Sequence, residues 1–246
     1  MTVVLKLGGS VVTEKDRPET VADDALDDLV ATIAASGVDD LVLVHGGGSF
    51  GHHHASEHGV SDGSGSHDAA AAFAIHDAMK RLNDAVLARL HDAGVPALPV
   101  HPLSAASRDA DGDLSLPVGQ VRTMLDEGFV PVLHGDVVAH AGEGVTIVSG
   151  DELVVELARG LDADRVGLCS TVPGVLDADG AVIPDIASFD AVADVLGGSA
   201  ATDVTGGMAA KVRALLALDA PAFVFGPAAL EAFLSGERAG SRIGAA

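Results

Sequence analysis

His45-Gly46-Gly47-Gly48-Ser49-Phe50-Gly51-His52 follows directly on Leu41-Val42-Leu43-Val44, an apolar run with the length and composition of a buried β-strand. Three adjacent glycines cost conformational entropy on folding, and they let the backbone approach a ligand closely. Consecutive backbone amides in such a turn can surround an anion. We therefore interpret this segment as an anion-binding turn at a strand end, with a purely structural loop as the alternative.

Two more glycine turns stand beside lysines. Val3-Val4-Leu5-Lys6-Leu7 predicts a first strand and runs into Gly8-Gly9-Ser10, so the Lys6 ammonium and the turn amides can reach one anion. Asp203-Val204-Thr205-Gly206-Gly207-Met208 precedes Lys211 at the start of a predicted helix, and such an N-terminus suits a phosphate chain. Each also has a plain interpretation, as a tight turn or as a capped helix with a solvated lysine.

The chain lacks the usual motifs of other enzyme classes. It has neither the G-x-x-x-x-G-K-[ST] spacing of a P-loop nor a G-x-G-x-x-G sequence that opens a helix, and it has no Cys-x-x-Cys pair or His-Glu-x-x-His helix. Asp136 and Asp151 each follow a strand and a glycine, and either could orient a lysine, hold a metal ion or cap a turn. His52-His53-His54 could bind a transition metal adventitiously, but we assign no metal site.

The charge is strongly negative. The chain has 14 basic and 36 acidic residues, a formal net charge of −22, which argues against a nucleic-acid partner. The acids are scattered rather than gathered in a tail, and we expect a protein adapted to a salty cytoplasm, where salt screens self-repulsion. Lysine occurs only at positions 6, 15, 80 and 211, so these positions are candidates for sites that need a compact ammonium group.

No apolar run approaches the roughly 18 residues of a membrane-spanning helix, and we expect no membrane partner. The first residues read as a strand rather than as a signal peptide, so we expect a cytoplasmic location. Cys169 is the single cysteine and lies in an apolar run, which favours a buried strand thiol.

Strands alternate with helices along the whole chain, which predicts a mostly parallel sheet covered on both faces. We expect one compact domain, residues 1–246, with lobes of about 1–148 and about 149–246. Ligands of such sheets bind beyond the carboxyl ends of the strands, where the glycine turns lie. We expect strands at 3–7, 41–44, 95–100, 129–133, 166–169 and 222–225, a hairpin over 137–148, a mobile surface loop over 52–67, and helices at 20–36, 68–93, 118–127, 149–161, 188–196, 206–218 and from 228.

Taken together, Lys6–Ser10, His45–His52, His134-Gly135-Asp136, Ser149-Gly150-Asp151 and Asp203–Met208 resemble the amino acid kinase superfamily in order and spacing over the whole chain. Within it the chain is most similar to the isopentenyl phosphate kinases, an archaeal family of the alternative mevalonate pathway, because their acceptor-contacting histidine matches His52. The resemblance implies a three-layer αβα sandwich, a homodimer, and transfer of phosphate from ATP with Mg²⁺ to isopentenyl phosphate or a similar small alkyl phosphate, giving the diphosphate.

The resemblance also implies roles for residues at matching positions. Lys6, Lys15, His52, Asp151 and Lys211 would be catalytic, with the Lys6 and Lys211 ammonium groups on the transferring and β-phosphates, Lys15 stabilising the transition state and Asp151 organising the lysines. The ATP-binding set would be Lys6, Leu7, Gly8, Gly9, Ser10, Gly48, Thr171, Gly206 and Lys211. The acceptor would contact Gly47, His52 and Gly150. An ionised acceptor phosphate needs no general base, so His52 would donate a hydrogen bond.

One segment departs from the family. Ser170-Thr171-Val172-Pro173-Gly174-Val175 has Thr171 where relatives have an acid, which puts the nucleotide preference in question. Other acceptors stay open: a phosphonate such as fosfomycin, an acylated amino acid, or a nucleoside monophosphate. The apolar residues Phe73, Met79 and Leu82 of the 68–93 helix could hold a hydrocarbon tail or form plain core. A non-catalytic nucleotide-binding regulatory domain is the third alternative.

Overall fold

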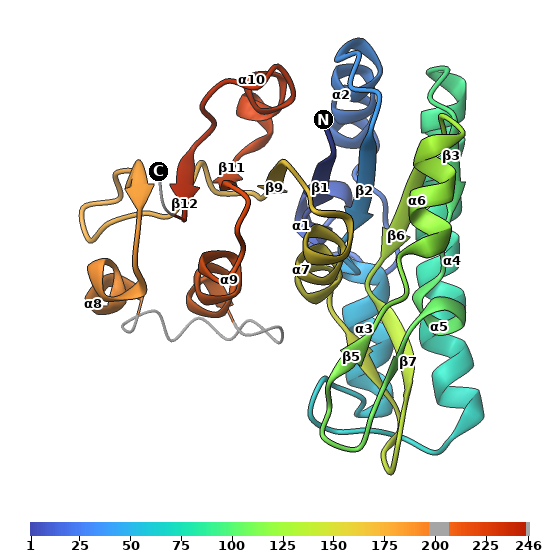
Figure 1. The fold of residues 1–246 in the computed structure, drawn as a ribbon. Coiled ribbons are helices and arrows are strands. Elements are labelled where there is room, and N and C mark those ends of the chain that lie inside the picture. The colour runs from blue at the N-terminus through green and yellow to red at the C-terminus, as the bar shows by residue number, and fades with distance from the viewer. Residues whose placement is uncertain (197–206, 245–246) are drawn as a thin grey trace.

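The computed structural model describes residues 1–196 and 207–244. Its main sheet has eight strands in the order β10-β12-β11-β9-β1-β2-β6-β3 (Figure 1). Every neighbouring pair is parallel except β11 and β12, so the prediction of a mostly parallel sheet is confirmed. The strands are β1 (Val3–Leu7), β2 (Leu41–His45), β3 (Ala97–Pro99), β6 (Val130–His134), β9 (Arg165–Cys169), β10 (Asp185–Ile186), β11 (Ala222–Phe225) and β12 (Ser241–Ile243).

Helices cover both faces of this sheet. Side chains alternate along a strand, so Val4 and Val42 enter one apolar cluster while Leu5 and Leu43 enter another. The first cluster is closed by α6 (Gly119–Asp126), α7 (Gly150–Leu161) and α9 (Gly207–Leu216), and the second by α2 (Asp23–Ala35), α4 (Ala69–Asp92) and α10 (Leu230–Leu234). The fold is therefore the three-layer αβα sandwich that the sequence predicted.

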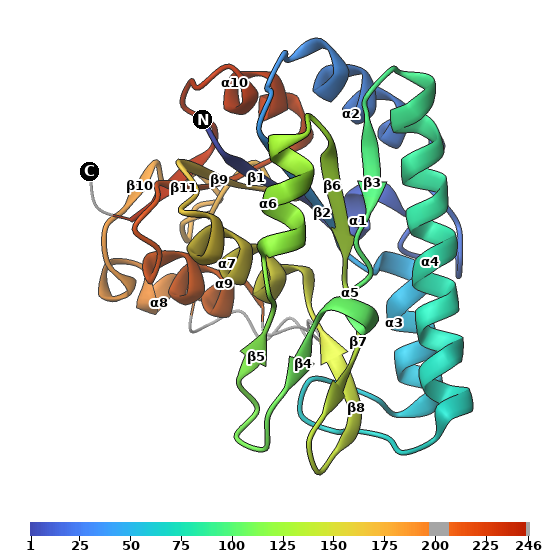
Figure 2. The same ribbon diagram turned by 45° about the vertical axis from the view of Figure 1, so that its right-hand side comes forward.

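A second, smaller sheet lies beyond the carboxyl ends of the central strands, beside the lower half of α4 (Figure 2). Its order is β5-β4-β7-β8, and β7 with β8 forms the predicted hairpin. The short helices α1 and α5 lie at strand ends. Their bounds are β4 (Ser107–Arg108), β5 (Leu114–Ser115), β7 (Asp136–His140), β8 (Gly144–Val148), α1 (Gly9–Val12) and α5 (Pro102–Ala105).

The expected mobile loop over 52–67 is wrong in its first half. Residues Gly48–His58 form α3, which lies against α4 and buries Phe50 and Ala55. The polar composition of this segment concealed a helix with only a narrow apolar face. Gly59, with φ +65°, ends the helix in the left-handed conformation that favours glycine.

Shorter differences fall in the C-terminal third. The helix expected over 188–196 is a 3₁₀ turn, Phe189–Ala191, followed by α8 (Ala193–Leu196), and a 3₁₀ turn at Pro227–Ala229 precedes α10. The sequence did not predict the two- and three-residue strands β4, β5, β10 and β12, which are too short to show a period. One sheet runs through both expected lobes, and the division near residue 148 stays a prediction.

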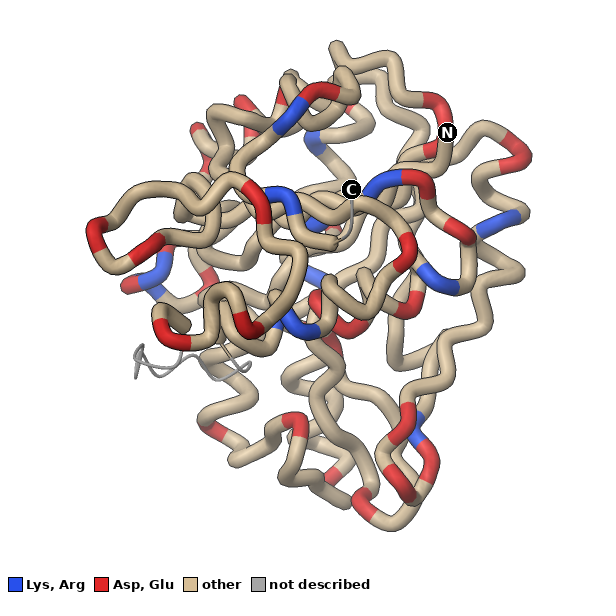
Figure 3. The backbone as a smooth tube through the Cα atoms, turned by 60° about the vertical axis from the view of Figure 1, so that its left-hand side comes forward, with Lys and Arg blue, Asp and Glu red and all other residues tan. Residues whose placement is uncertain are grey.

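Two whole-chain features bear on function. Acidic positions are spread over the whole fold rather than gathered at one end (Figure 3). Within the described ranges, none of the helices combines the length and apolarity needed to cross a membrane.

Candidate active site

The first two glycine turns pack against each other at the end of the sheet. β1 and β2 are parallel, with Leu7 opposite His45, so the turns that follow them lie side by side. A Cβ on Gly9 would lie 2.3 Å from the Gly48 nitrogen, and a Cβ on Gly46 would lie 2.5 Å from the Gly9 nitrogen. Both distances are far below contact, so backbone approach, rather than flexibility alone, requires these glycines.

Thr13 joins the two turns. Its Oγ1 donates to the Gly9 carbonyl at 2.8 Å and accepts from the Ser49 backbone nitrogen at 3.0 Å. Gly48 has φ +47°, and a Cβ there would lie 2.1 Å from the same Oγ1. Sequence analysis missed Thr13, because a threonine after a short turn carries no distinguishing pattern.

A buried carboxylate holds two lysines over these turns. Lys6 Nζ lies 2.5 Å from Asp151 Oδ1, and Lys211 Nζ lies 3.4 Å from Asp151 Oδ2. Burial would raise the pKa of the Asp151 carboxyl, but the charges and hydrogen bonds of Lys6 and Lys211 outweigh it and hold the pKa below its usual range. Asp151 is thus ionised at neutral pH and spaces two ammonium groups.

The start of α7 brings Asp151 to this place. Ser149 caps the helix by accepting from the Glu152 amide at 3.2 Å, and the Glu152 side chain accepts from the Ser149 amide at 2.9 Å. This confirms the predicted capping box. A Cβ on Gly150 would lie 3.0 Å from Lys6 Cε, so a glycine here lets the lysine pass the helix end closely.

These elements line one open cavity of about 1480 Å³. Single-ligand sites are usually about 300–1,000 Å³, so two small ligands have room here. The cavity brings together most of the predicted residues: Lys6, Gly8, Gly9, Ser10, Lys15, Gly47, Gly48, His52, Gly150, Asp151, Thr171 and Lys211.

Two other ATP-binding residues were predicted, Leu7 and Gly206. The Leu7 side chain is buried in the core, and Leu7 is not among the residues that line the cavity. The Leu7 carbonyl instead accepts from the Gly46 amide at 2.9 Å, which helps to join the two turns. Gly206, together with Asp203, lies outside the described residues.

The chain is similar to known proteins in both sequence and fold. The profile of the Amino acid kinase family matches residues 1–219. The chain belongs to this family. It is 70% identical over 244 residues, 98% of each chain, to an isopentenyl phosphate kinase of Haloferax volcanii, and 36% identical to one of Methanothermobacter thermautotrophicus over 88% of this chain and 86% of that one. A solved isopentenyl phosphate kinase structure superposes with a TM-score of 0.84 at 30% identity, covering 99% of this chain and all of the other.

The long helix of this amino acid kinase family member contributes less apolar wall than predicted. Of the three side chains proposed for a tail, Phe73 is 64% exposed and Leu82 is fully buried in the core. Met79 lines the cavity, joined by Ile75 from the same helix, and the Met79 sulfur would lie 2.8 Å from a Cβ on Gly51. The apolar surface that α4 gives to the cavity is therefore Ile75 and Met79, next to the start of α3.

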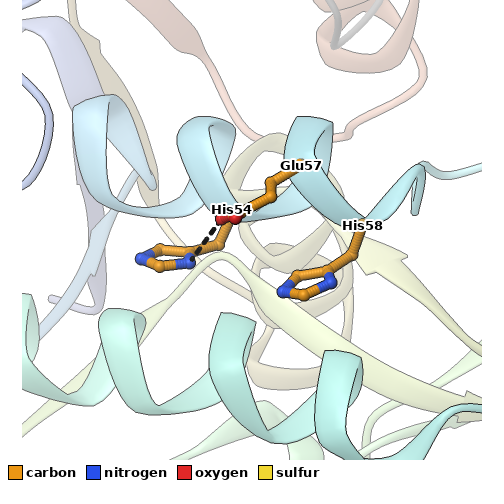
Figure 4. A group of neighbouring side chains, drawn as sticks. All are labelled: His54, Glu57 and His58. Carbon is orange, nitrogen blue, oxygen red and sulfur yellow. Dashed lines mark ion pairs between the residues drawn. The ribbon is translucent and has the colours of Figure 1, made fainter.

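Three side chains on the far half of α3 could hold a metal ion. Donor atoms of His54, Glu57 and His58 lie within 4.8 Å of one another (Figure 4). His54 already bonds Glu19 through Nε2 and lies 3.7 Å from Glu57 through Nδ1, while Glu57 and His58 are exposed. The contacts of His54 with Glu19 and Glu57 account for the closeness of His54 and Glu57, and the assignment of no metal site stays a prediction.

Proposed function

We infer that this chain is a kinase that transfers the γ-phosphoryl group of ATP to isopentenyl phosphate, giving ADP and isopentenyl diphosphate. The observation that carries this inference is the meeting of Lys6, Asp151 and Lys211 with His52 in one cavity. The chain also shares 70% identity with the Haloferax volcanii isopentenyl phosphate kinase over almost its full length.

The chemistry suits this set of residues. Donor and acceptor are both phosphates, so the protein must hold two anions in line and stabilise the charge that moves between them. We assign the Lys6 and Lys211 ammonium groups to the transferring and β-phosphates, and Lys15 to the transition state. Asp151 keeps Lys6 and Lys211 apart and oriented, since each occupies a different carboxylate oxygen.

The glycine turns supply neutral donors on the nucleotide side. We propose that Gly8, Gly9, Ser10 and Gly48 cradle the ATP phosphates, because all four line the cavity and consecutive backbone amides in such turns can point at an anion. Thr171 lines the same cavity in place of the usual acid and would contact the nucleotide without charge.

The acceptor phosphate would lie between the starts of two helices. His52 is exposed on the first turns of α3, and Gly47 and Gly150 stand at the N-termini of α3 and α7. Helix N-termini favour anions, and an ionised phosphate oxygen attacks without a base. The His52 ring would therefore donate a hydrogen bond to the acceptor.

Mg²⁺ would enter with ATP. The ion prefers phosphate oxygens, water and one or two carboxylates, and the Asp151 carboxylate is already engaged by two ammonium groups. The described cavity residues would therefore leave Mg²⁺ to be held mainly by the phosphate oxygens of ATP. Bound there, Mg²⁺ would neutralise part of their charge.

Four further assignments are proposals, two of them from the resemblance (the homodimer and the pathway) and two from the sequence itself (the location and the lobes). They are a homodimer, a cytoplasmic location, a place in isoprene biosynthesis through the alternative mevalonate pathway, and the two lobes near 1–148 and 149–246. The strongly negative charge supports a halophilic habitat.

An acceptor panel tests the function. ADP release is followed with saturating Mg-ATP and, in turn, isopentenyl phosphate, fosfomycin, N-acetylglutamate, uridine monophosphate or no acceptor. We expect isopentenyl phosphate to give the highest kcat/KM. A higher kcat/KM for another acceptor would make that compound the substrate. If no acceptor raised ADP release above the rate without acceptor, only a nucleotide-binding role would remain.

A further inference from the structure

Two fully buried histidines stand directly behind the acceptor side of the cavity. His45 ends β2 and His134 ends β6, and the two are partners in the parallel register. Their rings stack with centroids 5.5 Å apart and planes 28° apart. Each is followed by a glycine, Gly46 or Gly135, that lines the cavity. The proposed mechanism uses neither ring.

Each ring is hydrogen-bonded to the carbonyl group of the glycine that follows it in the chain. His45 Nδ1 lies 3.1 Å from the Gly46 carbonyl oxygen, and His134 Nδ1 lies 3.0 Å from the Gly135 carbonyl oxygen. A carbonyl only accepts, so in both rings the hydrogen is on Nδ1. Burial lowers the pKa of both histidines, so the rings are neutral and their Nε2 atoms are acceptors.

Donors are present for both Nε2 atoms. His101 Nδ1 lies 2.9 Å from His134 Nε2 and donates to it. Asn83 Oδ1 lies 3.1 Å from His45 Nε2, and exchanging the amide oxygen and nitrogen of Asn83 by a half turn puts Nδ2 there as a donor. This exchange also gives a partner to Nδ2, which has none among the described residues. Both rings are thus fixed in one tautomer.

The hydrogen bond from His45 to the Gly46 carbonyl fixes the orientation of the peptide that joins Gly46 to Gly47. In a trans peptide the carbonyl and the following N–H point in opposite directions, and the described residues contain no cis bond. With the Gly46 carbonyl held back on the His45 ring, the Gly47 N–H faces away from the ring. A peptide that joins two glycines has little steric preference for one orientation. Without the hydrogen bond to His45 it could flip and turn its carbonyl oxygen toward the phosphate.

We propose that His45 is a positioning residue that locks the peptide after Gly46 with its N–H group toward the acceptor phosphate, and that the stacked His134 ring helps to hold His45 in place. This inference rests on the proposed function and deepens it, because it explains how a flexible triple glycine stays ready for an anion. His45 acts through the Gly47 amide and touches no reacting atom.

The cluster is anchored to α4 as well. His76 Nδ1 donates to Asp136 Oδ2 at 2.8 Å, and the Asp136 Oδ1 accepts from the Val137 amide at 2.8 Å. The His76 and His101 rings meet edge to face with centroids 5.8 Å apart. The long helix α4, through His76, thereby supports the strand that follows Gly135.

The test compares His45→Asn with His45→Leu. The asparagine amide nitrogen can occupy nearly the place of Nδ1 and keep the bond to the Gly46 carbonyl, whereas leucine fills the space without a donor. We expect His45→Leu to raise the KM for isopentenyl phosphate about tenfold, with the KM for ATP unchanged, and His45→Asn to restore most of the loss. Thermal unfolding of both variants controls for a general structural effect.

Equal impairment of both variants, or a KM for ATP that rises as much as the acceptor KM, would overturn the inference. If His45→Leu does not fold, His45→Ala makes the same comparison with His45→Asn, because alanine also lacks a donor for the Gly46 carbonyl. The wild type is assayed first, since its failure to phosphorylate isopentenyl phosphate would count against the proposed function alone. In that case calorimetric titration with inorganic phosphate tests the loop, with wild type and His45→Asn binding more tightly than His45→Leu.

Discussion

Asp151 places one negative charge between two ammonium groups, and this arrangement governs the site at the scale of single residues. Lys6 carries three donors and gives Asp151 one, so its other donors can reach phosphate oxygens. A buried carboxylate with two cations leaves a net positive centre. That centre attracts polyphosphate in a protein whose overall charge is −22.

His52 provides the sharpest test at this scale. Replacing it with alanine removes one donor to the acceptor phosphate in the transition state, so we expect His52→Ala to lower kcat about 10²-fold or more at saturating ATP. His58→Ala is the matched control, because His58 is also exposed on α3 but does not line the cavity. Steady-state kinetics with near wild-type turnover for His52→Ala, or an equal loss in both variants, would contradict the assigned role.

Single residues were predicted where their type is rare or their spacing is unusual. Lys6, Lys211 and Asp151 could be selected because lysine is scarce and the acid follows a capping serine and a glycine. Thr13 and Asn83 could not, since their importance comes from partners 36 and 38 residues away in the chain. Leu7 was included through family position, although its side chain faces the core.

At the scale of elements, two turns from different strands form one surface. Gly9 and Gly48 are in backbone contact, and Thr13 bonds both turns. The strands and long helices were predictable because apolar periodicity reports the face that is buried. The start of α3 was not, since its residues Gly48–His58 combine glycine, serine and histidine, and only packing on α4 makes them helical.

Gly9→Ala tests this contact between turns. A Cβ there meets backbone, which cannot give way like a flexible side chain, so we expect a loss of about 1–3 kcal/mol in the free energy of unfolding and a higher KM for ATP. Gly119→Ala is the control, because nothing lies within 4 Å of a Cβ at this first residue of α6. Urea unfolding measures both, and equal stability of the two variants would refute the close approach.

At the scale of the whole molecule, buried histidines and surface acids give opposite responses to acid. His134 stays neutral in the fold because burial lowers its pKa well below the ordinary value of 6.5. The unfolded chain takes up that proton first, so the His134 contribution to stability is complete above pH 6.5 and is lost as the pH falls below it. The raised pKa of Asp136, caused by its burial, acts in the opposite direction, as does protonation of surface acids.

Comparing the wild type with His134→Asn isolates the contribution of His134 to the pH dependence of stability. Between about pH 7.5 and about pH 5.5, we expect the wild type to lose more unfolding free energy than His134→Asn, by up to about 1.4 kcal/mol per pH unit for one proton. Urea unfolding of both proteins in the same salt provides the measurement. An identical pH dependence would show that His134 is not held neutral.

Net charge predicts a response to salt. The 36 acidic residues repel one another across the whole fold (Figure 3). Screening shortens the range of this repulsion from about 10 Å at 0.1 M salt to about 3 Å at 1 M. We therefore expect the midpoint of thermal unfolding to rise between these KCl concentrations. A midpoint that does not change would remove the argument for a halophilic habitat.

We propose that the cavity brings two phosphates face to face so that one phosphoryl group passes between them. Phosphorus-31 NMR of the enzyme with Mg-ATP and isopentenyl phosphate observes this bond directly. We predict that the isopentenyl phosphate signal is replaced by the two coupled signals of a diphosphate, in equal amount to the ADP formed. ADP accompanied by free inorganic phosphate, with the isopentenyl phosphate signal unchanged, would contradict the claim.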